Sequence, residues 1–295
     1  MLIKVGFLVS YDYEYLRISL PLVYKEADFI GLAIDQQRRT WNGGTFSIDD
    51  SFFDWLHAID VDRKISIYED DFYDPALTAI ENDSRERNML AQFMEKGGWH
   101  VQVDADEYFL NFATFASWLR AHPQWLDDPA SNPVDICAFL VVLYKKIPGG
   151  FLYVNENYDL CVLATNFPRY NIARTGINKR IFLPQVLLHQ SWARNEDEIS
   201  FKFANWGHTI DFNTSSHFRL WKNASEENYK TYHDFHPLKG SGWQSLGAVK
   251  GEDMNSIIHN LNKTGVLQFP SRLLIKWRLK EIKRQFMIRF FGRKY

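Results

Sequence analysis

The stretch Trp99-His100-Val101-Gln102-Val103-Asp104-Ala105-Asp106-Glu107 carries an apolar strand directly into three carboxylates. In extended backbone, residues two apart point to the same side, so Asp104 and Asp106 are expected to project together beyond the strand's carboxyl end. Open α/β sheets bind their ligands at this end. Two close carboxylates repel each other unless a cation lies beside them, and a hard divalent ion accepts carboxylate and phosphate oxygens together. The stretch predicts a metal and phosphate site; the alternative is an acidic cluster that opens a helix.

The first hundred residues alternate apolar runs with helix-like patterns. Such alternation, with acids at the ends of the runs, predicts a doubly wound α/β sheet. The segment 38–51 is rich in Gly, Asn and Thr and is expected to form a loop. We expect strands at 3–9, 29–34, 64–68 and 99–103, and helices over 16–23 and 75–96.

The middle of the chain adds further strands and two capped helices. Asn111 is placed to cap a helix with an apolar face, and Asn195 with Glu198 forms a capping box that begins another. We expect strands at 136–144, 151–154 and 160–164 in an antiparallel section, and another strand at 181–188. No Gly/Ser/Pro-rich linker divides the chain, so we expect one domain over 1–265 and a tail over 266–295.

Charge and composition exclude several classes of protein. The chain of 295 residues has a net charge of −2, but residues 272–295 hold nine Lys/Arg against one acid, a net of +8 that leaves about −10 for the rest. A nucleic-acid binder built on a basic main domain is therefore disfavoured. Two cysteines favour a reducing compartment, and no apolar run approaches the roughly 20 residues of a membrane span. We expect a soluble, cytoplasmic protein.

The basic tail places its apolar residues on one helical stripe. They recur at the spacing of an α-helix, and the basic residues lie largely elsewhere: Ile275, Leu279, Ile282, Phe286 and Phe290. A basic amphipathic helix of this kind lies on anionic membrane surfaces, which predicts a peripheral position on the inner face of the plasma membrane. The alternative is a C-terminal helix packed on the domain with a solvated basic face.

Three residues downstream could join the carboxylates. His189 ends a predicted strand, and imidazole is a plausible ligand for Mn²⁺ or a contact to diphosphate. Arg194 and Lys202 follow it, and such cations stabilise charge that builds up on a leaving phosphate. A lone His is more often structural, and surface cations are often only solvated.

These residues together resemble the family-2-like glycosyltransferases of the GT-A fold, over roughly residues 1 to 210. The resemblance rests on the strand and turn 5–12, the strand that ends at Asp35, Arg87-Asn88, the segment 103–109 and the block 189–194. It implies a single GT-A-type, Rossmann-like, doubly wound mixed sheet with a C-terminal basic amphipathic helix.

The resemblance also implies roles for individual residues. A nucleotide sugar, with a UDP-sugar expected first, would bind across the carboxyl ends of the first strands with Mn²⁺ or Mg²⁺. The metal ligands would be Asp104, Asp106 and His189. Ser10, Tyr11 and Asp35 would lie near the base and ribose, Arg87 near the nucleotide and Asp104 near the ribose or metal, with Arg194 and Lys202 as further donor-binding residues.

The acceptor side departs from an easy match. The turn Ser10-Tyr11-Asp12 lacks the Pro often found there, and no single acid after the cluster stands out as the base. Such families generally invert at the anomeric carbon and use a carboxylate to deprotonate the acceptor hydroxyl. Glu156 and Asp159, in the middle section, are the two candidates.

The sequence therefore predicts a metal-dependent glycosyltransferase that acts on a glycan or lipid-linked acceptor in surface polysaccharide assembly. Two alternatives stay open. A nucleotidyltransferase would use similar carboxylates and metal but attack the α-phosphate. A non-catalytic glycan-binding or scaffold protein would keep the fold and bind through its aromatic surfaces.

Overall fold

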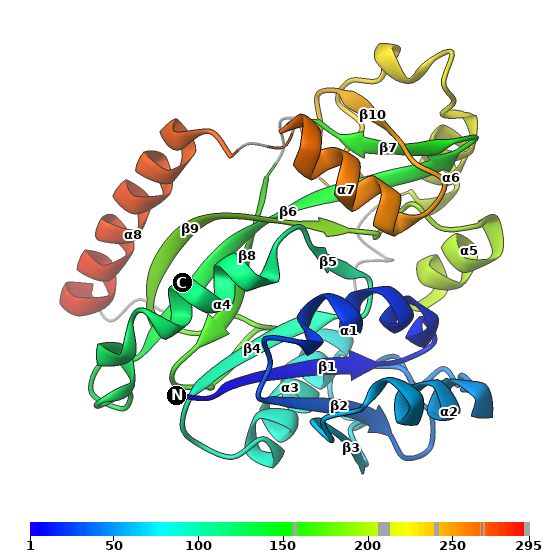
Figure 1. The fold of residues 1–295 in the computed structure, drawn as a ribbon. Coiled ribbons are helices and arrows are strands. Elements are labelled where there is room, and N and C mark those ends of the chain that lie inside the picture. The colour runs from blue at the N-terminus through cyan, green and yellow to red at the C-terminus, as the bar shows by residue number, and fades with distance from the viewer. Residues whose placement is uncertain (156–157, 206–212, 239–241, 266, 268, 292–295) are drawn as a thin grey trace.

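The sheet at the centre of the molecule has its parallel strands at one side. The structure is a computed structural model that describes residues 1–295 except 156–157, 206–212, 239–241, 266, 268 and 292–295 (Figure 1). Ten strands form one sheet whose main path has the order β10-β7-β6-β8-β4-β1-β2-β3. Parallel pairing joins β1 (Ile3–Val9), β2 (Phe29–Asp35), β3 (Ile65–Asp70) and β4 (Trp99–Asp104).

The other strands turn the parallel sheet into a mixed one. They are β5 (Glu107–Phe109), β6 (Val134–Ile147), β7 (Gly150–Val154), β8 (Asp159–Thr165), β9 (Lys179–His189) and β10 (Leu246–Lys250). β8 lies antiparallel to both β4 and β6, and β7 lies antiparallel to β6 and β10. β9 runs parallel to β6 and antiparallel to the short β5, so it forms a branch of the sheet.

Helices cover both faces of the parallel part. The alternate strand residues Ile3, Val5 and Phe7 share a core with α1 (Leu16–Tyr24), α2 (Asp50–Ile59) and α4 (Phe112–Arg120). On the other face, Leu8 packs against α3 (Ala79–Phe93), whose approach is close because two strand residues are glycines. A Cβ at Gly6 would lie 2.9 Å from Leu90 Cδ2, and a Cβ at Gly31 would lie 3.0 Å from Leu90 Cδ1. The predicted Rossmann-like, doubly wound mixed sheet is confirmed, and its assignment to the GT-A type stays a prediction.

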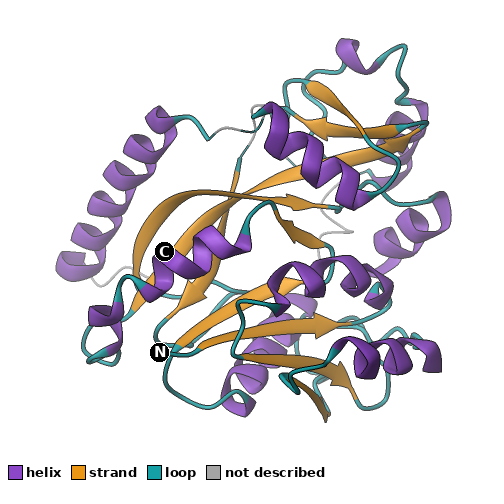
Figure 2. Cartoon of the chain, viewed as in Figure 1, coloured by secondary structure: helices purple, strands orange, loops and turns teal. Residues whose placement is uncertain are grey.

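The remaining helices lie around the mixed half of the sheet (Figure 2). They are α5 (Glu196–Asn205), α6 (Thr214–Asn223), α7 (Met254–Thr264) and α8 (Ser271–Phe291), with short 3₁₀ turns η1 (Tyr13–Tyr15), η2 (Pro123–Leu126) and η4 (Tyr229–Thr231). α8 packs on β9, where Trp277 stacks on Phe182 with 6.1 Å between ring centroids. In the described part of the chain, no helix combines the length and apolar character needed to span a bilayer. The division at residue 265 remains a prediction.

Local signals predicted most elements well, with two corrections. The expected loop 38–51 contains the first residues of α2, because the side chain of Asp49 caps that helix by accepting a hydrogen bond from Ser51 N. The helix expected from residue 75 begins at Ala79, where Thr78 and Glu81 form a capping box. The expected antiparallel section is confirmed, because β6 pairs antiparallel with both β7 and β8.

Candidate functional site at the carboxyl ends of β1 and β4

The acidic stretch lies at the edge where β1, β4 and β9 end. Leu8 of β1 pairs with Asp104, the last residue of β4, and Glu107 of β5 pairs with His189, the last residue of β9. Ala105 and Asp106 form the turn between β4 and β5. The two-residue alternation of a strand therefore does not extend from Asp104 to Asp106, and their carboxylates contact different partners.

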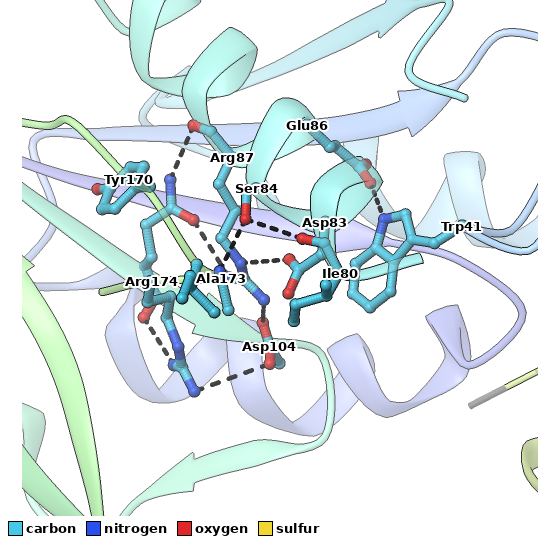
Figure 3. A network of polar contacts seen from close by, with 12 residues as sticks. Trp41, Ile80, Asp83, Ser84, Glu86, Arg87, Asp104, Tyr170, Ala173 and Arg174 are labelled. Carbon is cyan, nitrogen blue, oxygen red and sulfur yellow. Dashed lines mark hydrogen bonds and ion pairs between the residues drawn. The ribbon is translucent and has the colours of Figure 1, made fainter. Parts of the chain in front are cut away.

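Asp104 belongs to an arginine network, which we call the Asp104 network: Asp83, Arg87, Gln102, Asp104, Glu107 and Arg174. Figure 3 shows Arg87 and Arg174 on either side of Asp104, with Asp83 beside Arg87. Arg87 is buried on α3 and uses all three guanidinium nitrogens. Its Nε donates to Asp83 Oδ1 at 2.6 Å, its Nη1 to Gln102 Oε1 at 3.2 Å and its Nη2 to Asp104 Oδ1 at 2.8 Å. Arg87 therefore orients Asp104, and each of its three guanidinium nitrogens already has one acceptor within the protein.

Arg174 forms the other half of this network. It donates from two nitrogens to the fully buried carboxylate of Glu107, at 2.7 and 2.6 Å, and lies 3.8 Å from Asp104 Oδ2. Glu107 in turn accepts a hydrogen bond from the backbone N of Asp104 at 3.1 Å. Burial opposes ionisation of Asp104, but the charges of Arg87 and Arg174 outweigh it and hold its pKa below the usual value.

Asp106 belongs to a second cluster, which we call the Asp106 network: Asp12, Asp106, His189 and Arg194. Arg194 Nη2 bridges two carboxylates, at 2.6 Å from Asp106 Oδ2 and 2.9 Å from Asp12 Oδ2. The other oxygen, Asp106 Oδ1, lies 3.5 Å from His189 Nε2. Backbone bonding fixes the same turn, because Gln190 N donates to Asp106 O at 2.9 Å.

The charges of the Asp106 network set the protonation of its members. Burial opposes ionisation of Asp106, yet His189 and Arg194 hold its pKa well below the usual value. For His189, burial lowers the pKa but the Asp106 carboxylate raises it by more, so the pKa is above its usual value. Burial raises the pKa of Asp12, against the opposing charge of Arg194.

Arg194 and Lys202 add positive charge to this side of the turn. The Arg194 guanidinium lies over the Tyr15 ring at 4.8 Å, and its Nη1 is buried with no hydrogen-bond acceptor among the described residues. Lys202, on α5, donates from Nζ to Ser191 O and Ser191 Oγ, both at 2.9 Å. Burial lowers the pKa of Lys202 to about 8, so much of it remains charged at neutral pH.

The residues expected near the base and ribose lie at the ends of β1 and β2. Ser10 and Tyr11 are half-buried in the turn after β1, and Tyr11 packs on Phe201 with 4.8 Å between ring centroids. Asp35 is buried, and its two oxygens accept hydrogen bonds from the side chain and backbone of Arg39 and from the backbone of Gln37 and Phe72. These partners occupy Asp35 within the protein, so it shapes the pocket edge rather than presenting an open acceptor.

Of the two candidate bases, one is described. Asp159 opens β8 opposite Leu140 of β6, and its half-buried side chain forms no hydrogen bond or ion pair with another described residue. Because β8 is antiparallel to β4, Asp159 lies toward the carboxyl end of β4. Glu156 falls outside the described residues.

The three expected metal ligands are divided between the two networks. Among the residues that the structure describes, no group of three or more His, Cys, Asp or Glu side chains is arranged to hold a metal ion. Asp106 Oδ1 and His189 Nε2, 3.5 Å apart, are close enough to occupy neighbouring positions on one ion. Mg²⁺ is commonly held by one or two protein ligands together with substrate phosphates, so this pair fits such an ion. Asp104 instead faces Arg87 and Arg174.

Four residues of these networks were missed from the sequence: Asp12, Asp83, Gln102 and Arg174. Asp12 is the third residue after β1, and its position just beyond a strand end could have identified it. Gln102 lies two residues before Asp104 on β4, so strand alternation could have placed it beside Asp104. Asp83 lies four residues before Arg87, the spacing of an ion pair on one helical face, which could also have been found. Arg174 lies in a loop 67 residues from Glu107, and no local pattern indicates that contact.

Comparisons with known proteins give little information about the function of this chain. No family model matches it, and no curated protein matches it. Among solved structures, residues 1–349 of S. aureus TarS match with a TM-score of 0.29 and 14% identity over 50% of this chain and 36% of that one. The same protein in complex with UDP gives a TM-score of 0.29 and 15% identity over 50% of this chain and 37% of that one.

A second solved structure covers more of the chain. A UDP-glucose pyrophosphorylase complexed with UDP-glucose matches with a TM-score of 0.31 and 7% identity over 66% of this chain and 92% of that one. By contrast, this chain spans little more than a third of the length of the TarS structures. Similarities this weak do not establish an activity, and the family resemblance stays a prediction.

Proposed function

We propose that this protein is a glycosyltransferase that moves a sugar from a nucleotide diphosphate donor, in the first place a UDP-sugar, to a glycan or lipid-linked acceptor. The observation that carries the proposal is the Asp106 network at the carboxyl ends of β1 and β4. There, a buried ionised carboxylate lies against His189 on one oxygen and Arg194 on the other. Open α/β sheets bind nucleotides at this edge.

Four residues of the site would bind the donor diphosphate, each through a different group. Asp106 and His189 would hold Mn²⁺ or Mg²⁺, which supplies positive charge to the diphosphate when bound. Arg194 would offer its buried Nη1, which has no acceptor among the described residues. Lys202 adds a further cation on α5, so negative charge that develops on the leaving group would be stabilised by groups already in place.

Other residues would position these groups. Arg194 is held between Asp12 and Asp106, which fixes the direction of its guanidinium. Arg87 and Arg174 hold Asp104 at the end of β4, where it would approach the ribose or the metal. Ser10, Tyr11 and Asp35 would border the base and ribose, with Asp35 acting through Arg39 and the backbone.

For the acceptor, we propose Glu156 or Asp159 as the base that removes the hydroxyl proton while the sugar is transferred with inversion. The oxygen of the acceptor forms a bond to the anomeric carbon as the bond to the nucleoside diphosphate breaks, and the carboxylate receives the proton. A role in surface polysaccharide assembly would follow from a lipid-linked acceptor. The predicted cytoplasmic location is consistent with two buried cysteines that are both free.

A donor screen tests the proposal directly. The purified protein is incubated with UDP-, GDP- and CMP-sugars with Mn²⁺, Mg²⁺ or EDTA, and release of the free nucleotide is measured. We expect release with one donor class, its loss in EDTA, and a fall of about 1,000-fold in Asp106→Asn. Asp54→Asn, at an exposed position of α2, is the matched control and should retain activity.

Other outcomes would contradict the proposal. Release of pyrophosphate from a nucleoside triphosphate in the presence of a sugar phosphate would identify a nucleotidyltransferase. No thermal stabilisation by any nucleotide sugar would support a scaffold protein, because a bound ligand at a hundredfold excess over Kd stabilises the fold by about 2.7 kcal/mol. Full activity in EDTA would contradict the proposed metal requirement but not the proposed sugar transfer.

A further inference from the structure

The outward face of α8 is an exposed apolar stripe. Five large side chains along the helix are each 53–67% exposed, and they are Ile275, Leu279, Ile282, Phe286 and Phe290. At about 100° of rotation per residue, the five fall within an arc of roughly 80°. This arrangement is one continuous apolar surface on a single helix rather than scattered single residues, and such surfaces mark interaction sites.

The opposite face of α8 attaches the helix to the domain. Leu274 and Trp277 pack against the buried cluster around Phe139 and Phe182. Glu281 is buried, accepts a hydrogen bond from the backbone N of Arg180 at 3.0 Å and pairs with Arg284. Because the helix is held through this inner face, the outer stripe is presented on a fixed support. α8 thus packs on the domain, as the second sequence alternative expected, and its exposed face is apolar as well as basic. The membrane position stays a prediction.

Cations border the stripe on both sides. Arg272, Lys276, Lys280 and Lys283 lie along one side, where together with Ile275 and Leu279 they line a shallow depression. By the same rotation of about 100° per residue, Arg278 and Arg289 lie along the other side. Glu281, the one acid of the helix, is on the inner face. The outward surface thus combines apolar side chains with positive charge alone.

We propose that this face of α8 docks on the surface of an anionic lipid bilayer. Apolar side chains would enter the boundary between headgroups and acyl chains, and the flanking cations would lie at the level of the anionic headgroups. A second copy of the chain is disfavoured, because two such faces would bring cations against cations. The rest of the chain carries about −10 and would be repelled by the same surface, so the charge distribution orients the molecule with α8 against the bilayer.

The test is sedimentation of the full chain with phosphatidylcholine vesicles, with and without phosphatidylglycerol. We expect binding that requires phosphatidylglycerol and weakens as salt is raised. The double variant Leu279→Asp with Phe286→Asp should lower partitioning by at least about tenfold. Val61→Asp with Ile67→Asp, at two exposed residues away from α8, places the same two new charges elsewhere and should bind as the wild type does.

A second variant keeps the test valid if the first does not fold. Lys276→Glu with Lys283→Glu changes only exposed charges and should also lower partitioning by at least about tenfold, with the melting temperature unchanged. Equal sedimentation of wild type and both variants would overturn the proposal. A lipid-free dimer that Leu279→Asp with Phe286→Asp dissociates, without vesicle binding by the wild type, would overturn it in favour of a second copy.

Discussion

The Asp104 and Asp106 networks meet at one turn but differ in how completely their groups are paired. In the Asp104 network, every guanidinium nitrogen of Arg87 has an acceptor, and Glu107 is held by two nitrogens of Arg174. In the Asp106 network, His189 is partly exposed and Arg194 Nη1 has no acceptor among the described residues. A fully paired buried network rigidifies the fold, whereas available groups can bind a ligand. We therefore expect mutations in the first network to reduce stability and mutations in the second to reduce activity.

Removing Arg87 should give the largest effect. Arg87→Met leaves the buried carboxylate of Asp83 without its cation and removes the nearer of the two cations of Asp104. Breaking a buried ion pair from one side costs about 3–5 kcal/mol of unfolding free energy. Urea unfolding measures the change. The exposed pair of Lys222 and Glu196 is the control, because Lys222→Met should cost less than about 1 kcal/mol. A loss below that value in Arg87→Met would mean that the network does not hold the fold.

Glu86, on the same helix as Arg87, should make stability depend on pH. Burial raises the pKa of Glu86 to about 8, against a hydrogen bond from Trp41 Nε1 that lowers it. Between its ordinary pKa of 4.5 and about 8, the unfolded chain releases the proton while the folded protein keeps it, so the unfolding free energy falls as pH rises through this window. The fall should be at most about 5 kcal/mol, because each pKa unit corresponds to about 1.4 kcal/mol.

Chemical unfolding at a series of pH values measures this dependence. Glu86→Gln should remove most of the slope between pH 4.5 and about 8, because the amide does not titrate there. Glu252→Gln, at an exposed position, should leave the slope unchanged. If the unfolding free energy of Glu86→Gln still falls with pH as in the wild type, other groups cause the dependence.

In the Asp106 network, His189→Asn should reduce activity with little change in stability. The buried carboxylate of Asp106 keeps its ion pair with Arg194 when the imidazole is removed, so the loss leaves no buried charge unpaired. We expect kcat/KM to fall by about 10- to 100-fold and the Mn²⁺ concentration for half-maximal activity to rise. His57→Asn, on the exposed surface of α2, should change neither quantity. An unchanged Mn²⁺ dependence in His189→Asn would show that His189 is not a metal ligand.

The smallest expected effect comes from the cap of α5, the helix that carries Lys202. Asn195→Ala removes the side chain that accepts from Glu198 N and should cost about 1 kcal/mol of stability. Asn111→Ala, which removes the cap of α4, should cost a similar amount. Only the change at Asn195 should lower activity, because α5 positions Lys202. Equal activity in both variants would separate α5 from the site.

The sequence predicted those features of the fold that have local signals. The strand runs beginning at Ile3, Phe29 and Trp99 and the caps at Asn111 and Asn195 are found where local pattern placed them. α2 was missed because the Gly-rich run before it hid the cap at Asp49.

The site was less predictable than the fold. The divergence of Asp104 and Asp106 depends on a turn that replaces the expected continuation of the strand, and the cations beside them come from distant segments. Arginines 17 and 88 residues away in sequence satisfy the two carboxylates. Carboxylate spacing alone therefore indicated a need for positive charge but not whether side chains or a metal would provide it.

The length of β9 has a consequence for the acceptor. The backbone of Arg180, near the start of the strand, is bonded to α8, and His189 is its last residue. Nine residues of extended chain span about 30 Å, so β9 sets the distance between its attachment to α8 and His189 of the Asp106 network. If the proposed transfer and docking both hold, a molecule with β9 upright on the bilayer would hold the proposed site at that height above the lipid and would select acceptors whose sugar chains reach it. A molecule lying on its side would lower that site and admit acceptors with short headgroups.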